Sequence, residues 1–364
     1  MSETMEQKGR IVLDLKPGAN NPRNSEGAFL DMEDGRLLFA YSRYSGESGA
    51  DDGKACIASR YSSDNGETWT GDIIIVEPEE YGVCNIMSVS LLRMSNNDVG
   101  LFYLIRYGVH DLRIHLRRSS DEGNTWGSAI CSIPARGCYV TNNDRIVRLS
   151  SGRIIIPAAF HKMCGESECN FSSMDIHGIT HFFLSDDDGV TWREAKNFCA
   201  LQSRHSGSGL QEPGLIELRN GTLWAWARTD LDRQYEMTST DCGETWTVPE
   251  PSRFSSPCSP LSMKRMPNDN LLAVWNPIPA YDMGPLTRNW PEQRTPLIAA
   301  LSKDEGVTWD RYFYIEPGAN GGGYCYTAIH FSKDSLFLAY CAGDKDDDCC
   351  LFRLKIRKIQ LSDV

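Results

Sequence analysis

Polar side chains that could do chemistry stand at the ends of otherwise apolar, strand-like segments. In QEPGLIELRNGTLWAWART, Glu212 precedes one apolar run, Arg228 ends the next, and Asn220-Gly221 forms the turn signal between them. A hairpin brings the start of its first strand beside the end of its second. The carboxylate, which can exchange a proton, and the guanidinium, which can bind an anion, can therefore face one site. The alternative is a structural salt bridge.

A second hairpin, CYVTNNDRIVRLSSGRIIIPAAFH, carries polar residues at the corresponding positions. Asp144 and Arg145 stand before its first apolar run, and His161 ends its second. Three interpretations stay open. The three residues can be structural, they can line a substrate pocket, or they can act as an acid and a base. Arg106, which ends the run LFYLIR, is a similar candidate.

The frame Ser-x-Asp-x-Gly-x-Thr-Trp, here called the Asp box, recurs along the chain. It occurs as SSDNGETWT, SSDEGNTWG, SDDDGVTWR, STDCGETWT and SKDEGVTWD, starting at Ser62, Ser119, Ser185, Ser239 and Ser302. The closing tryptophans are 57, 66, 54 and 63 residues apart, a period typical of repeat architectures. Asp accepts backbone N–H groups in a tight turn, Gly takes a positive φ, and Trp packs between sheets. The boxes are therefore predicted to be structural.

Between the boxes, short β-branched and aromatic runs follow turn signals, as in EDGRLLFAYS, and no helical period is sustained. The prediction is an all-β, six-bladed β-propeller with five Asp-box repeats, as one domain over residues 1–364. Three strands after Trp309 and a fourth from RIVLDL near the N-terminus would form the last blade. Seven blades are the alternative, if one long segment hides a blade without a box.

Charge and composition restrict the partners. The formal net charge of −12 disfavours nucleic acid, and no run of 18 apolar residues predicts a membrane span. The N-terminus, MSETMEQKGRIVLDL, has no apolar signal region, so we expect a cytoplasmic protein unless a leader was removed. An anionic small ligand requires a local cluster of arginines. The oligomeric state is not predicted.

The thirteen cysteines are an odd number and are scattered, so we expect mostly reduced, structural thiols. The sequence has no CxxC motif with a second such pair, so a zinc site is not predicted. No metal or organic cofactor is predicted.

The five Asp boxes resemble those of the sialidase (neuraminidase) superfamily, over nearly the whole length of the chain. The resemblance implies a ligand site at the axial mouth of the propeller. It also implies three arginines that hold the substrate carboxylate, a tyrosine nucleophile assisted by a glutamate, and an aspartate as acid/base. A family role is assigned below only to a residue whose segment matches the family pattern.

The segment around the hairpin QEPGLIELRNGTLWAWART resembles the family pattern that assigns Glu212 as the assisting base and Arg228 to the arginine triad. Arg294, which opens the strand running into the last box, stands in the place of another triad arginine. The segment GANGGGYCYTAIHF resembles the nucleophile region and implies Tyr326. Tyr324, two residues away on the same expected strand face, is the alternative.

The N-terminal segment resembles the family's opening less closely. Arg23 stands where the first triad arginine is expected, but the family's Arg-Ile-Pro tripeptide is missing and Pro22 precedes the arginine instead. Arg43 is a possible substitute. In the family, the loop before the strand into the first box carries the acid/base. The resemblance therefore implies Asp51 or Asp52, which lie in this loop, for that role.

The resemblance favours an exo-acting sialidase-like glycosidase that releases a terminal acidic sugar with retention of configuration. A neutral phenol suits this substrate, because a carboxylate nucleophile would be repelled by its charge. Two alternatives remain. One is a glycosidase or lyase for another uronic or ulosonic acid that uses His161 or Asp144. The other is a non-catalytic propeller that binds glycans.

Overall fold

Short alternating apolar segments between glycine turns give a chain built of β-strands. The computed structural model describes residues 5–165, 173–278, 294–318 and 321–364. Besides strands it has the short 3-10 helices η1 (Pro78–Tyr81) and η4 (Leu361–Asp363). Within the described part of the chain, no helix has the length and hydrophobicity needed to cross a bilayer. The all-β prediction is confirmed.

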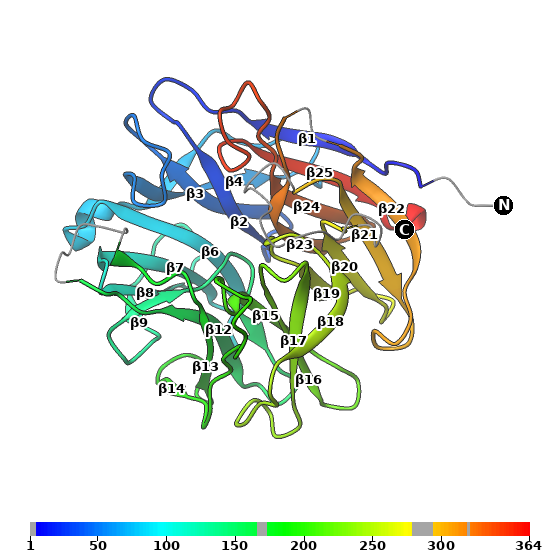
Figure 1. Ribbon diagram of the computed structural model, residues 1–364. Coiled ribbons are helices and arrows are strands. Elements are labelled where there is room, and N and C mark those ends of the chain that lie inside the picture. The colour runs from blue at the N-terminus through cyan, green and yellow to red at the C-terminus, as the bar shows by residue number, and fades with distance from the viewer. Residues whose placement is uncertain (1–4, 166–172, 279–293, 319–320) are drawn as a thin grey trace.

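The strands form antiparallel units that follow one another along the chain (Figure 1). The first unit is β2 (Asn24–Asp31), β3 (Leu37–Tyr44), β4 (Ala55–Ser62) and β5 (Ile73–Val76). The second is β6 (Asn85–Arg93), β7 (Val99–Gly108), β8 (Asp111–Ser119) and β9 (Ile130–Cys131). The third is β10 (Cys138–Val140), β11 (Val147–Arg148), β12 (Ile154–His161), β13 (Ile179–Ser185) and β14 (Arg193–Glu194). The fourth is β15 (Gln211–Glu217), β16 (Leu223–Arg228), β17 (Arg233–Ser239) and β18 (Glu250–Ser255).

The fifth unit is β19 (Ser262–Arg265), β20 (Leu271–Trp275), β21 (Leu297–Ser302) and β22 (Asp310–Glu316). The last unit joins the two ends of the chain. It combines β23 (Cys325–Ser332), β24 (Ser335–Cys341) and β25 (Leu354–Gln360) with β1 (Arg10–Leu15), which pairs with β25. Figure 1 shows β1 lying along β25 at the edge of this sheet. The N-terminal strand thus completes a sheet whose other strands come from the C-terminus.

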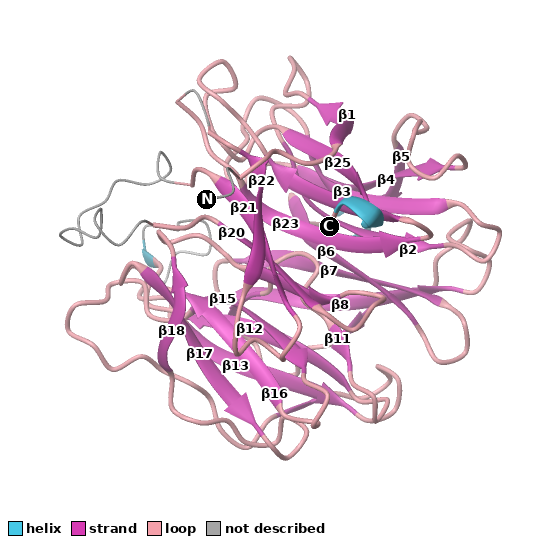
Figure 2. Ribbon diagram, turned by 90° about the vertical axis from the view of Figure 1, so that its right-hand side faces the viewer, coloured by secondary structure: helices cyan, strands magenta, loops and turns pink. Residues whose placement is uncertain are grey.

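Neighbouring units contact one another mainly through their first, inner strands. β2 contacts β6 and β23, β15 contacts β12 and β19, and β19 contacts β23. The apolar core lies between units: Phe102 packs with Phe183, and Leu272 with Leu336, in clusters shared by adjacent sheets. Figure 2 shows the same sheets from the side, with the loops gathered at their ends. The inner strands of different units therefore lie next to one another.

Each Asp box forms the turn expected of it. In the first box, the hydroxyl of Ser62 accepts the Gly66 N–H at 2.8 Å, and the Asp64 carboxylate accepts the backbone N–H and the hydroxyl of Thr68 at 2.9 and 2.6 Å. The other boxes repeat these bonds through Asp121, Asp187, Asp241 and Asp304. The box is a self-contained hydrogen-bonded turn.

The boxes also connect each unit to the one before it. The residue after the Asp bonds to the hairpin turn of the preceding unit in all five boxes: Glu122 to Glu33, Asp188 to Ser95, Cys242 to Arg153, Glu305 to Arg219, and Asn65 to Asp334 of the last unit. The box glycine packs close to that unit as well. A Cβ on Gly66 would lie 2.2 Å from the Phe337 ring, and one on Gly306 would lie 2.4 Å from the Trp224 ring.

Gly66→Ala is expected to destabilise the fold by roughly 2–4 kcal/mol, because it adds a left-handed backbone penalty to overpacking against Phe337. Gly66 has φ +79°, and the control Gly35 has φ +84° with no atom within 4 Å of its Cβ position. Gly35→Ala should therefore cost only about 1–2 kcal/mol. Chemical denaturation of both variants measures the difference. Equal losses would contradict a packing role for Gly66.

Candidate active site

Bulges in four inner strands aim side chains at one cavity. Glu26 on β2, Ser88 on β6, Glu212 on β15 and Tyr326 on β23 have positive φ angles of 55°, 57°, 47° and 57°. The pairing register of each strand shifts at the same place. A bulge interrupts the alternation of a strand and re-aims the bulged side chain. All four residues line one cavity of about 350 Å³.

Tyr326 on β23 and Glu212 on β15 meet in this cavity from two different units. The Tyr326 hydroxyl donates to Glu212 Oε1 at 2.9 Å. Arg228 Nη1 lies 3.0 Å from Glu212 Oε2 and 3.5 Å from the Tyr326 oxygen, and Gln211 Oε1 accepts from Arg228 Nε at 3.1 Å. Burial, and then the charge of Glu212, hold the pKa of Tyr326 well above its ordinary value. The phenol is protonated at neutral pH, and its proton already points at a carboxylate.

Arg294 adds a second guanidinium beside the tyrosine. Its Cζ lies 5.4 Å from the centre of the Tyr326 ring, and its Nη2 donates to the Cys258 carbonyl at 3.1 Å. The Arg294 side chain is 1% exposed. Arg228 and Arg294, from different units, therefore approach Tyr326 together.

Most N–H groups of the Arg23 guanidinium already donate hydrogen bonds to other residues of the protein. Its Nη1 donates to Asp51 Oδ1 at 2.6 Å and to the Gly49 carbonyl at 3.2 Å. Its Nη2 donates to Glu26 Oε1 at 3.0 Å, and its Nε to the Ser25 hydroxyl at 3.0 Å. These bonds use four of the five N–H groups of a guanidinium. Arg23 thus organises two carboxylates of the site.

Asp51, Asp52 and Arg106 also line the cavity. Arg106 Nη2 donates to the Asp51 carbonyl at 3.1 Å, which fixes the loop before β4. Desolvation within the cavity opposes ionisation of Asp51, but the charge and hydrogen bond of Arg23 outweigh it and hold the pKa of Asp51 below its usual range. Asp51 is therefore a carboxylate in this arrangement.

Glu26 is a site residue that sequence reasoning missed. It is 4% exposed, and besides Arg23 it accepts a hydrogen bond from the Ser88 hydroxyl. Burial raises the pKa of Glu26 to about 7, against the lowering effects of Arg23 and Ser88. One signal could have found it: a carboxylate early in an apolar strand with a glycine close behind, as in Ser-Glu-Gly here and Glu-Pro-Gly at Glu212.

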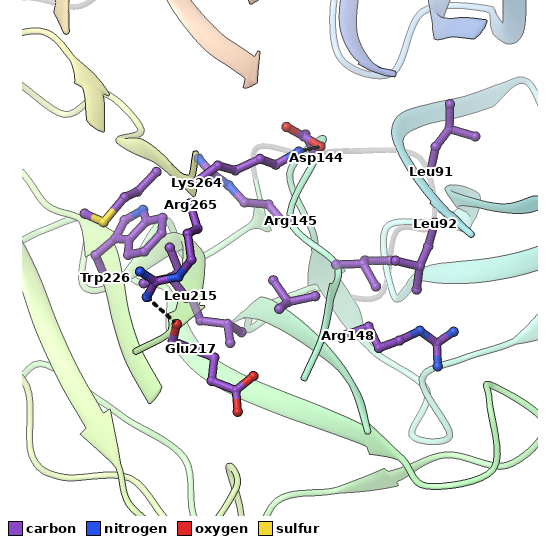
Figure 3. A pocket seen from close by; sticks show the side chains of 14 residues that line it. Leu91, Leu92, Asp144, Arg145, Arg148, Leu215, Glu217, Trp226, Lys264 and Arg265 are labelled. Carbon is purple, nitrogen blue, oxygen red and sulfur yellow. Dashed lines mark hydrogen bonds and ion pairs between the residues drawn. The ribbon is translucent and has the colours of Figure 1, made fainter. Parts of the chain in front are cut away.

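Asp144 and Arg145 lie at a second cavity, of about 370 Å³, instead (Figure 3). Glu217 lines this second cavity, five residues beyond Glu212 on β15, which corresponds to roughly 16 Å along a strand. Asp144 Oδ1 accepts from Lys264 Nζ at 2.6 Å, and Arg145 Nη2 donates to the Leu261 carbonyl at 2.7 Å. Asp144 and Arg145 therefore do not line the cavity that holds Tyr326, although the charge of Glu212 acts on Arg145.

Three further candidates do not line the cavity, although His161 is close enough to Arg228 and Glu212 for their charges to act on it. Strand alternation turns Arg43 outward, where its Nε pairs with Asp72 at 3.0 Å, so it does not substitute for Arg23. His161 is buried, and its Nδ1 lies 3.0 Å from the Asp175 carbonyl. The Tyr324 hydroxyl donates to the Gly318 carbonyl at 2.7 Å. Tyr324 and Tyr326 do not share a face, because the bulge at Tyr326 breaks the alternation on which that expectation rested.

The thiols and potential metal ligands contribute no further centre in the described part of the chain. Its twelve cysteines are free, and Cys325, Cys341 and Cys350 pack together behind Tyr326. In the same residues, no group of three or more His, Cys, Asp or Glu side chains is arranged to hold a metal ion.

Several solved structures have a fold similar to that of this chain. A solved protein of unknown function from Dyadobacter fermentans has a TM-score of 0.70 at 16% identity, covering 96% of this chain and 99% of that one. The intramolecular trans-sialidase from Ruminococcus gnavus, in complex with oseltamivir carboxylate, has a TM-score of 0.69 at 15% identity, covering 97% of each chain. The NanB sialidase from Streptococcus pneumoniae has a TM-score of 0.68 at 14% identity, covering 98% of this chain and 71% of that one.

No curated protein matches the sequence. At these identities the structural likeness shows a shared fold. A family model described as a BNR repeat-like domain matches residues 20–338, which is most of the chain. The chain therefore belongs to the BNR repeat-like domain family and has the fold of the sialidases.

Proposed function

We propose that this protein is an exo-acting, sialidase-like glycoside hydrolase that releases a terminal sialic acid or a related acidic sugar. The observation that carries the proposal is the contact of Tyr326 with Glu212 at 2.9 Å, with Arg228 beside both. In this proposal the antiparallel units are the blades of a six-bladed propeller with five Asp boxes, and residues 1–364 form one domain.

Tyr326 is the nucleophile of the proposed reaction. Its oxygen attacks the anomeric carbon while Glu212 takes the phenolic proton, so the attacking group is neutral when an anionic sugar binds. The bond to the leaving oxygen breaks as that oxygen receives a proton from an acid of the site. Water then displaces the tyrosine in a second step. Two displacements at one carbon retain its configuration.

The acidic group of the sugar is bound by arginines in this proposal. Arg228 and Arg294 approach Tyr326 from two units, and Arg106 lines the same cavity. Guanidinium groups bind carboxylates through paired, charge-assisted hydrogen bonds, which overcomes the net charge of −12. Met87, Leu104 and other apolar residues form one wall, against which a methyl group of the sugar can pack. A cavity of about 350 Å³ suits one terminal sugar.

Hydrolysis of a fluorogenic α-ketoside of N-acetylneuraminic acid tests the proposal. We expect turnover by the wild-type protein, and NMR of the first product should show the same anomer as the substrate, because the mechanism is retaining. Matched glycosides of glucuronic acid and of a ulosonic acid lacking the acetamido group are the controls for the sugar. A well-folded wild-type protein that hydrolyses none of them would refute the glycosidase proposal.

The state of Arg23 favours one alternative. Because four of its N–H groups are already bound, Arg23 has little capacity left for a substrate carboxylate. A glycosidase or lyase for a different uronic or ulosonic acid, recognised mainly by Arg228 and Arg294, is therefore the second candidate. It predicts turnover of one of the control glycosides and none of the sialoside.

A further inference from the structure

Glu26, Asp51 and Asp52 are the carboxyl groups of the cavity to which the reaction above assigns no step, and Glu26 is the most buried of them. It lines the same cavity as Tyr326 and Glu212, and it is 4% exposed. Its backbone is held at φ 55° by a bulge of β2, a conformation that costs energy for a residue other than glycine. Arg23 and Ser88 each bond one of its two oxygens. The surrounding structure therefore holds this side chain at one place in the cavity.

The two other carboxyl groups near Arg23 are less suited to donate a proton. Asp51 is 66% exposed, and Arg23 Nη1 binds it at 2.6 Å as a carboxylate. Asp52 lies on the exposed part of the same loop. A proton donor must hold a proton at the working pH and exchange it in a site that excludes water. Glu26 is buried, and its pKa of about 7, raised by burial, allows both states near neutral pH.

We propose that Glu26 is the acid/base residue of this site and that Arg23 and Ser88 position it. The inference rests on the proposed glycosidase function and replaces Asp51 and Asp52 in that role. It also explains why Arg23 is bound to protein carboxylates. In this arrangement Arg23 orients the acid, and Arg228 and Arg294 bind the substrate.

The proton balance is complete with these residues. In the first step the Glu26 proton goes to the leaving oxygen as its bond to the anomeric carbon breaks, and the Tyr326 proton goes to Glu212 as the new bond forms. In the second step Glu26 takes a proton from the attacking water, the bond to Tyr326 breaks, and Glu212 returns the proton to the phenol. Both carboxyl groups and the tyrosine regain their starting states.

Several charged or titratable groups face Glu26 and set its protonation. They are Arg23, Tyr44, Asp51, Asp52, Arg106, Glu212, Tyr326 and Cys341. The positive charge of Arg23 favours the ionised form of Glu26, whereas burial and the negative charges of Asp51 and Glu212 favour the protonated form. A group with a raised pKa is protonated below that value, so activity that needs the acid is expected to fall as pH rises through about 7.

A leaving-group series separates Glu26 from the aspartates. Glu26→Gln should lower kcat/KM about 10²- to 10⁴-fold on a sialyl-lactose, whose leaving alcohol needs a proton, and much less on an aryl sialoside, whose phenol leaves unaided. Azide should restore turnover of the aryl sialoside and yield a glycosyl azide. Asp51→Asn and Asp52→Asn should show no such selectivity. Leaving-group selectivity and azide rescue in either aspartate variant, and not in Glu26→Gln, would overturn the inference.

A titration without substrate makes the test independent of the proposed function. With glutamate labelled by ¹³C at the carboxyl carbon, wild type should show a resonance that titrates near pH 7 and is missing from Glu26→Gln. Ser88→Ala should move that midpoint to higher pH, because the lost hydrogen bond favours the ionised form, and this variant assigns the resonance if Glu26→Gln does not fold. A Glu26 midpoint below pH 5 would overturn the inference even in an active hydrolase. Absence of turnover with a midpoint near 7 would reject the glycosidase proposal alone.

Discussion

Tyr326→Phe is expected to lower kcat/KM on the fluorogenic sialoside by about 10³-fold or more, because it removes the attacking oxygen. The substitution deletes one hydroxyl, and Glu212 keeps its ion pair with Arg228 at 3.0 Å. The cost in folding is therefore limited to about 1–3 kcal/mol for the lost partner of a buried carboxylate. Steady-state kinetics and a thermal melt on the same preparation separate lost chemistry from lost fold.

Tyr324→Phe is the matched control for this prediction. It deletes the same atom two residues away, where the hydroxyl donates to the Gly318 carbonyl outside the cavity. We expect kcat/KM to stay within about twofold of wild type, since no group that contacts the substrate changes. If both variants keep full activity, Tyr326 is not the nucleophile. If Tyr324→Phe alone loses activity, the assignment of the two tyrosines is reversed.

Arg228→Met is expected to reduce both activity and stability. The guanidinium is buried between Glu212, Gln211 and Tyr326, so its removal leaves the Glu212 carboxylate without its ion pair. Breaking one side of a buried pair costs about 3–5 kcal/mol. Loss of the contact to the substrate carboxylate should reduce kcat/KM about 100-fold or more, mainly through KM. Kinetics at several substrate concentrations and chemical denaturation measure the two effects.

Two further variants separate the loss of stability, caused by the unpaired Glu212, from the loss of activity, caused by the missing contact to the substrate. Adding Glu212→Gln to Arg228→Met removes the unpaired charge, so stability should recover in part while activity should not. Arg43→Met removes a partly exposed arginine that pairs with Asp72, and it should leave kcat/KM within about twofold of wild type. A loss of activity in Arg43→Met equal to that of Arg228→Met would contradict the assignment of the site.

The strands and box turns could be predicted because their determinants are local. Ser62, Asp64 and Thr68 complete the hydrogen bonds of their turn within seven residues. The hairpin around Asn220-Gly221 sets Glu212 and Arg228 on paired strands in the same way. Resemblance to sialidases added Tyr326 and Arg294, which the structure brings beside them, whereas the catalytic roles themselves stay predictions.

Other assignments failed because a bulge cannot be seen in an alternating pattern. Strict alternation put Tyr324 and Tyr326 on one face and gave no reason to select Glu26. The positive φ at Glu26 and at Tyr326 belongs to strands whose neighbours hold them in that conformation. Asp144 also has a positive φ, of 56°, but its carboxylate is bound by Lys264 at the second cavity.

By itself, the amino-acid sequence determined the repeats, the hairpins and the turns, because these depend on contacts between residues close together in the chain. Only the tertiary structure decided which side chains share a cavity. Tyr326 and Glu212 are 114 residues apart, and Glu26 and Ser88 are 62 apart. Contacts over such separations form only when the units pack together, and they depend on where each inner strand bulges.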